Sequence, residues 1–143
     1  MLALNLVVSG IVMYFVMFAM IDAWRDFHNN LNMAYMALTM VAPMGLLMLA
    51  TMGGMYGNRA LNAGLYVLFA ALFLAAFFGI RTQTAIGDRQ FIASMIPHHS
   101  GAILMCREAA LEDAELVALC SQIETAQRRE IEQMEAIQAR LAR

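Results

Sequence analysis

Methionine is the residue type whose spacing in this chain points most directly to chemistry. In the second hydrophobic stretch the methionines recur every three or four residues, at Met33, Met36, Met40, Met44, Met48, Met52 and Met55. This spacing keeps them on one helix face, within an arc of roughly 160°. At about 1.5 Å per residue the series covers roughly 33 Å, the hydrocarbon thickness of a bilayer. Thioether sulfur is a preferred ligand of Cu(I), but methionine also fills gaps between helices. This methionine ladder therefore indicates either a path for a soft metal, centred on Met40, Met44, Met48 and Met52, or packing.

A second set of candidate ligands follows Asp88 in the segment Met95-Ile-Pro-His98-His99 and continues to Met105. Met95 precedes the two histidines by three and four residues, so on a helix its sulfur reaches the neighbourhood of both imidazoles. Imidazole binds copper and zinc, and a thioether shifts the preference towards Cu(I). A lone buried histidine is more often structural. Two adjacent histidines beside a methionine favour a metal site instead, with copper as the expected metal and zinc as the alternative.

The composition is that of a membrane protein. The chain is 62% hydrophobic and 14% charged, and almost all the charge follows residue 80. Three apolar stretches, at about 2–21, 33–56 and 60–80, are long enough to span a bilayer. The first has no Lys or Arg ahead of it and no clear cleavage site, so we expect a retained helix rather than a signal peptide. The net charge of −2 and the absence of Lys argue against a nucleic-acid partner. We therefore predict a three-span domain over 1–81, in contact with membrane lipid.

Residues 82–143 predict an all-α appendage of two amphipathic helices in an antiparallel hairpin. The first helix is expected over 88–110, and Asp113 or a neighbour caps a second that runs to near Leu141. A turn near 111–113 pairs residues whose numbers sum to about 225, which places His98 opposite Gln127 and Met95 opposite Glu130. The second helix carries an apolar stripe that two helices cannot bury alone. The membrane unit, a second copy or a partner protein must cover it, so we expect a homo-oligomer or a subunit of a membrane complex.

The double motif of the hairpin is specific. It reads D-x-x-F-x-x-x-M-I-P-H-H-S-x-A-I-L-M at 88–105 and I-x-x-x-Q-x-x-E-I-x-x-M at 123–134. Over about residues 85–142 the chain resembles the ferritin-like helical family called domain of unknown function 305 (DUF 305). The resemblance implies a hairpin that forms half of a ferritin-like bundle, often outside the cytoplasm, in a family with members linked to copper or silver binding and resistance. By position it implies the site residues Asp88, Met95, His98, His99, Met105, Gln127, Glu130 and Met134. The methionine-rich N-terminal part resembles a membrane-anchored subgroup.

This chain departs from the family pattern at Cys106 and Cys120, where alanine is more common. The hairpin register places the two near one another. They could form a disulfide in an oxidising compartment, serve as additional Cu(I) ligands if reduced, or be independent small buried residues. All three alternatives stay open at this point.

The loop after the first span carries Asp22, Asp26 and His28 and, with three spans, lies on the same side as the hairpin. Loop polarity explains its carboxylates, and His28 is a weaker candidate ligand. The arginine count slightly favours a cytoplasmic hairpin. The family resemblance favours the opposite, so we expect a bacterial inner (plasma) membrane protein whose C-terminal domain is periplasmic or otherwise extracytoplasmic.

Three functions fit these patterns. The first is a membrane-anchored protein that captures Cu(I) or Ag(I) at the hairpin and passes it towards the methionine ladder. The second is a small copper transporter, because three spans with a Met-x-x-x-Met helix loosely resemble the eukaryotic copper-uptake trimers, which lack this hairpin. The third is an accessory subunit in which methionines only pack. No enzyme is expected, since there is no Ser/His/Asp arrangement, phosphate-binding loop or paired Glu-x-x-His motif.

Overall fold

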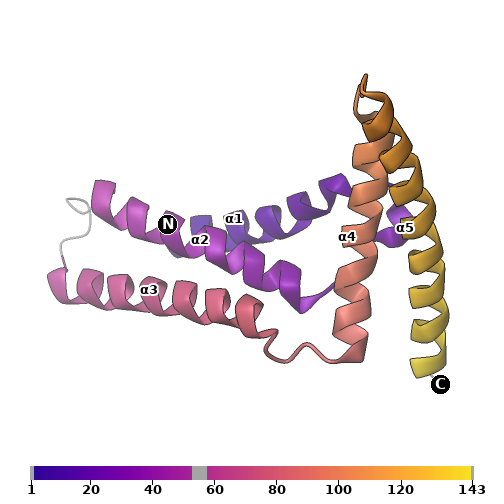
Figure 1. Cartoon of the computed structure of the whole chain (residues 1–143). Coiled ribbons are helices and arrows are strands. Elements are labelled where there is room, and N and C mark those ends of the chain that lie inside the picture. Colours follow the sequence, from indigo (N-terminus) through magenta and orange to yellow (C-terminus); the bar gives the residue numbers. More distant parts are fainter. Residues whose placement is uncertain (1, 53–57, 143) are drawn as a thin grey trace. The chain divides into compact units, whose positions relative to one another are not determined.

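The computed structural model describes residues 2–52 and 58–142, and its regular structure in these ranges is entirely helical (Figure 1). The helices are α1 (Leu2–Val16), α2 (Leu31–Met52), α3 (Arg59–Thr82), α4 (Asp88–Glu108) and α5 (Ala114–Leu141), with two short 3-10 helices, η1 (Met17–Met20) and η2 (Trp24–Asp26). The all-α class is confirmed, and each helix lies within a few residues of its predicted range. Met55, the last residue of the predicted ladder, is outside the described residues.

Three helices are long and apolar enough to cross a membrane, as the sequence predicts. They are Leu2–Met20, Leu31–Met52 and Arg59–Thr82, with mean hydropathies of 2.2, 1.8 and 2.3. Their 19, 22 and 24 residues match the length that a bilayer requires. Asn58 caps α3 by accepting a hydrogen bond from the Leu61 N–H at 3.0 Å, and Gln83 ends the helix in the left-handed conformation.

In the first compact unit, α2 packs against both α1 and α3. Leu2, Leu6, Leu49 and Phe69 form its buried core. Gly45 lets α2 and α3 approach closely, because a Cβ there would come within 2.9 Å of the Phe69 ring. Small residues serve this purpose between membrane helices, where close backbone approach increases van der Waals contact.

Ala71, Ala75 and Gly79 recur every four residues on α3, a spacing that predicts a small-residue ridge for helix packing, and this prediction is only partly correct. Gly79 is buried and would meet the Tyr35 ring at 3.2 Å if it carried a Cβ. Ala71 and Ala75 are instead exposed, and the buried positions of α3 are Phe69, Ala76 and Gly79. A bulky aromatic therefore takes part in the contact with α2, where the i+4 pattern predicted alanine.

The methionine ladder divides into two kinds of position. Met44 and Met48 are half-buried and pack against the core of the first unit. Met40 and Met52 are 50% and 37% exposed. The central four methionines thus include two with a packing role, whereas the other two lie open on the surface of the unit.

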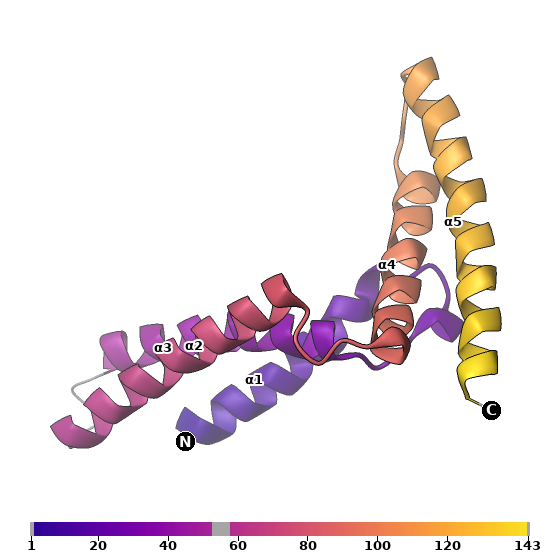
Figure 2. The same ribbon diagram turned by 60° about the horizontal axis from the view of Figure 1, so that its bottom comes forward.

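The second compact unit is built on the predicted hairpin, in which α4 and α5 lie side by side and antiparallel (Figures 1 and 2). Asp113 caps α5 by accepting a hydrogen bond from the Leu116 N–H at 2.9 Å. The core consists of four buried isoleucines, against which the apolar stripe of α5 packs: Ile92, Ile96, Ile103 and Ile131, with Met134, Ile137 and Leu141. The predicted cap and core stripe are therefore confirmed.

A disulfide joins Cys106 to Cys120 near the turn, with Cα atoms 5.3 Å apart. It confirms the predicted register and answers the question that the sequence left open. By cross-linking two helices across a short connection, the bond stabilises the hairpin by up to about 3 kcal/mol.

The division into two compact units does not follow the order of the chain. Residues Phe18–Asn30, which connect α1 to α2, belong to the same compact unit as α4 and α5. We call this segment the docked loop. The docked loop packs on part of the hairpin. It therefore buries some of the hairpin surface that was expected to be covered by the membrane unit, a second copy or a partner protein.

Candidate metal site

His99 is the best-defined candidate ligand on the hairpin. Its side chain is 10% exposed. The ring Nδ1–H donates to the Met95 carbonyl at 2.9 Å, because a carbonyl can only accept. The Nε2 atom lies 2.8 Å from Oε2 of Glu130 on α5, within hydrogen-bond distance. Metal-binding histidines commonly donate one ring N–H to a carbonyl and so present the other nitrogen in a fixed direction. His99 has this arrangement.

Met95 and His98 belong to the same turn of α4. Met95 is half-buried, and His98 is exposed with its ring centroid 6.0 Å from that of His99. One helical turn therefore combines a thioether and two imidazoles, the set that the motif predicts. Pro97 is buried within this turn, and α4 continues through it.

On α5 the predicted residues divide between pairing and packing. Glu130 is the partner of His99, with a side chain that is 52% exposed. Met134 is half-buried and packs against the isoleucine core. Gln127 is half-buried one turn before Glu130. Of these three, Glu130 is the one brought into contact with a candidate ligand of α4 by a hydrogen bond.

Asp88 and Met105 lie at the two ends of α4, away from this turn. Asp88 is the first residue of the helix, where a carboxylate is favourable beside the free N–H groups. Met105 is 59% exposed. Each is six or more residues from His99, hence about 9 Å or more along the helix axis. The structure therefore does not bring Asp88 or Met105 to the turn of Met95 and His99.

Within residues 2–52 and 58–142, no three His, Cys, Asp or Glu side chains come together in a metal-binding group. Met95, one turn before His99, carries a ligand of another kind and is half-buried. A soft thioether together with imidazole suits Cu(I) and Ag(I).

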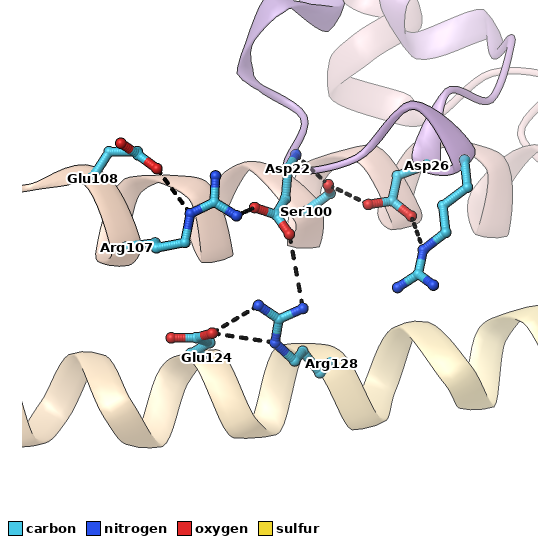
Figure 3. Close-up of polar contacts among 8 residues, drawn as sticks. Asp22, Asp26, Ser100, Arg107, Glu108, Glu124 and Arg128 are labelled. Carbon is cyan, nitrogen blue, oxygen red and sulfur yellow. Dashed lines mark hydrogen bonds and ion pairs between the residues drawn. The ribbon is translucent and has the colours of Figure 1, made fainter.

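Ser100, directly after the two histidines, attaches the docked loop to the hairpin (Figure 3). Its side chain has no exposed surface. Its Oγ accepts a hydrogen bond from the Asp22 N–H and donates one to Oδ2 of Asp26, both at 2.6 Å. Asp26 is 3% exposed, and its other oxygen lies 3.6 Å from Nε of Arg25. A single hydroxyl therefore satisfies a backbone donor and one oxygen of a buried carboxylate. The other oxygen, Oδ1 of Asp26, has no hydrogen-bond partner among the described residues.

Two arginines hold the other side of Asp22 (Figure 3). Arg107 of α4 donates to one carboxylate oxygen, and Nη1 of Arg128 of α5 lies 3.7 Å from the other. The pKa of Arg107 is raised, chiefly by its side-chain hydrogen bond to Glu108 and further by the charge of Asp22, against a lowering effect of desolvation. Asp22 thus bridges the two helices of the hairpin.

Sequence reasoning missed the clamp made by Ser100, Asp22 and Asp26. The two aspartates were explained as ordinary loop polarity, although Asp26 is buried. Gly101 supplies a further signal, because a Cβ there would come within 3.3 Å of the Met20 carbonyl. His28, the weaker candidate ligand, is half-buried, and its Nδ1 accepts or donates no hydrogen bond within the described part of the chain.

Comparison with known proteins supports the assignment of the hairpin. Residues 74–138 match the family described as "Domain of unknown function (DUF305)". An uncharacterized protein of Acanthamoeba polyphaga mimivirus is 30% identical over 114 residues, which cover 78% of this chain and 73% of that protein. Because the hairpin makes up less than half of the chain, this similarity extends into the apolar helices. No solved structure matches significantly. The chain belongs to the DUF305 family.

Proposed function

We propose that this chain is a membrane-anchored protein that binds Cu(I) or Ag(I) at the turn of Met95, His98 and His99. Its role would lie in metal handling or resistance. The observation that carries the proposal is the orientation of His99, whose Nδ1 is held by the Met95 carbonyl at 2.9 Å. The Nε2 atom is thereby presented towards α5 as a nitrogen ligand.

Glu130 gives this proposal a specific chemistry. Nε2 of His99 is hydrogen-bonded to the Glu130 carboxylate. A cation bound at Nε2 would replace this hydrogen bond, and the carboxylate would remain beside the cation as a favourable charge. The Met95 sulfur and the His98 imidazole supply the remaining soft and borderline ligands from the same helical turn.

The positions of the ladder methionines bear on the two alternative functions, an accessory subunit and a small copper transporter. Met44 and Met48 pack in the core of the first unit, which favours the accessory-subunit alternative for that part of the ladder. Met40 and Met52 are exposed, which leaves them available to a metal path or to a small copper transporter. The hairpin motif favours metal capture as the main activity.

A metal titration of the full-length protein in nanodiscs tests the proposal. We expect Cu(I) binding in competition with a chromophoric Cu(I) chelator, and Ag(I) binding under the same conditions. His98→Ala and Met95→Leu should each weaken the affinity by about tenfold or more, as expected for groups that hold or orient a metal. Met20→Leu, a methionine-to-leucine change at an exposed position of the docked loop, is the matched control and should leave the affinity unchanged.

Unchanged affinity in both His98→Ala and Met95→Leu would rule out this turn as the site. Binding of Zn(II) without any binding of Cu(I) would instead indicate a harder site made by histidine with Glu130 or Asp88.

We further propose that the hairpin lies outside the cytoplasm of a bacterial inner membrane. The disulfide between Cys106 and Cys120 supports this side, because such bonds persist in oxidising compartments. In intact cells, a membrane-impermeant maleimide should label the chain only after mild reduction. Since the chain has two cysteines, the double serine variant is a complete background control. Labelling that requires broken membranes and no reductant would place the hairpin inside.

A further inference from the structure

Trp24 is the most exposed large hydrophobic side chain among the described residues, at 87%. It is also the single tryptophan of the chain. Tryptophan is among the residues with most apolar surface to remove from water, and it is highly buried on average in folded proteins. An indole left this open is free to contact a partner outside the described structure.

Hydrogen bonds and ion pairs hold the aspartates on either side of Trp24 against the hairpin. Trp24 opens the 3-10 helix η2, between the two aspartates that Ser100 binds. Asp26 is 3% exposed and Asp22 is held by Arg107 and Arg128. The backbone on both sides of Trp24 is thus fixed to the hairpin while the indole stays outside.

The position of Trp24 along the chain limits which partner can meet it. The first apolar span ends at Met20, four residues earlier, and α2 begins at Leu31, seven residues later. Four residues extend over at most about 14 Å, so the Cα atom of Trp24 lies within that distance of the end of the span. Tryptophan is enriched at the interface between membrane and water, where its ring meets the lipid headgroups.

Arg25 adds the charge that such a surface attracts. Its side chain is 73% exposed, although Nε lies 3.6 Å from Asp26. The guanidinium therefore has free surface with which to bind a lipid phosphate, for which its planar donors are well suited. An aromatic residue and a cationic residue are thus adjacent in the chain, a few residues after a predicted span.

We propose that Trp24 and Arg25 anchor the docked loop in the headgroup layer of the membrane. The partner is the lipid surface itself. Through Ser100, the same anchor fixes the hairpin that carries the candidate metal site. This inference is independent of the bound metal.

The single tryptophan permits a direct test in the full-length protein, reconstituted in vesicles of phosphatidylcholine and phosphatidylglycerol. Trp24 emission should be shifted to the blue of a water-exposed indole and only weakly quenched by acrylamide. Lipids brominated near the glycerol backbone should remove most of the emission, and lipids brominated near the bilayer centre should remove less.

A matched reporter is the double variant Trp24→Phe and Phe91→Trp, which moves the indole to a 51% exposed position on α4. Its emission should be that of water-exposed indole and should be quenched by acrylamide. Water-like behaviour of Trp24 itself would overturn the proposal. So would a blue-shifted Trp24 that no brominated lipid quenches, because the indole would then be covered by protein. Stronger quenching from the bilayer centre would equally contradict a headgroup position.

Discussion

Replacing Ser100 with alanine is expected to release the docked loop from the hairpin. Alanine keeps the Cβ atom of serine and removes only the hydroxyl, so it neither accepts from the Asp22 N–H nor donates to Asp26. Asp26 would remain buried with only the 3.6 Å contact to Arg25. Removing one partner of a buried charge destabilises by about 3 kcal/mol, which raises the opening equilibrium of the loop roughly a hundredfold.

Amide hydrogen exchange of the full-length protein measures this opening directly. Exchange at Asp22 and along the docked loop should accelerate in Ser100→Ala, while the core of α4 and α5 keeps its protection. Ser121→Ala is the matched control, because Ser121 is exposed on α5 and its replacement should change stability by about 0.5 kcal/mol or less. Equal exchange in the two variants would show that the hydroxyl does not hold the loop.

A second substitution separates the charge from the shape. Once Ser100 is alanine, changing Asp26 to leucine removes the buried carboxylate that lost its donor. Replacing both partners of a buried polar contact by apolar groups of similar shape is nearly neutral. Slow exchange should therefore return in the double variant, and its absence would show that lost packing at the position of the hydroxyl, and not the unpaired carboxylate, opens the loop.

The helices were predictable because their signals are local. The apolar spans follow from hydropathy, and the start of α5 follows from an N-cap aspartate whose bond to the Leu116 N–H is formed. The hairpin register follows from turn length, and the disulfide between Cys106 and Cys120 agrees with it. The buried face of α3 was harder to predict from the sequence, because alanine occurs both at helix–helix contacts and on surfaces that face lipid. Phe69 could be accommodated only because Gly45 lies opposite.

The candidate site was predictable where the ligands share one helical turn. Met95, His98 and His99 required only the α-helical repeat. The predicted register placed Met95 opposite Glu130, whereas the hydrogen bond of Glu130 is made with His99, four residues further along α4. The Ser100 clamp joins residues 74 and 78 positions apart, and no periodicity relates a loop aspartate to a helical serine. The burial of Asp26 likewise cannot be recognised from the residues next to it in the sequence. Asp88 and Met105 belong to the same motif, but they lie near the two ends of α4, and helix geometry separates them from the histidines.

The methionine ladder yields the other large expected effect. Replacing Met40, Met44, Met48 and Met52 together by leucine should leave the chain folded, since leucine is similar in volume and such exchanges usually cost less than about 1.5 kcal/mol each. If the thioethers carry Cu(I), copper tolerance in cells and copper movement in reconstituted vesicles should nevertheless fall sharply. Leucine has no lone pair to offer a soft metal.

The structure allows the ladder to be divided into two matched double variants. Met44→Leu with Met48→Leu changes the half-buried pair of the core, and Met40→Leu with Met52→Leu changes the exposed pair. A continuous relay requires all four sulfurs, so both variants should lose copper movement while only the buried pair affects thermal stability. If the exposed pair behaves like the parent in copper assays and the buried pair changes stability alone, the methionines pack helices. Metal capture would then be confined to the hairpin, and the accessory-subunit function would account for the membrane part.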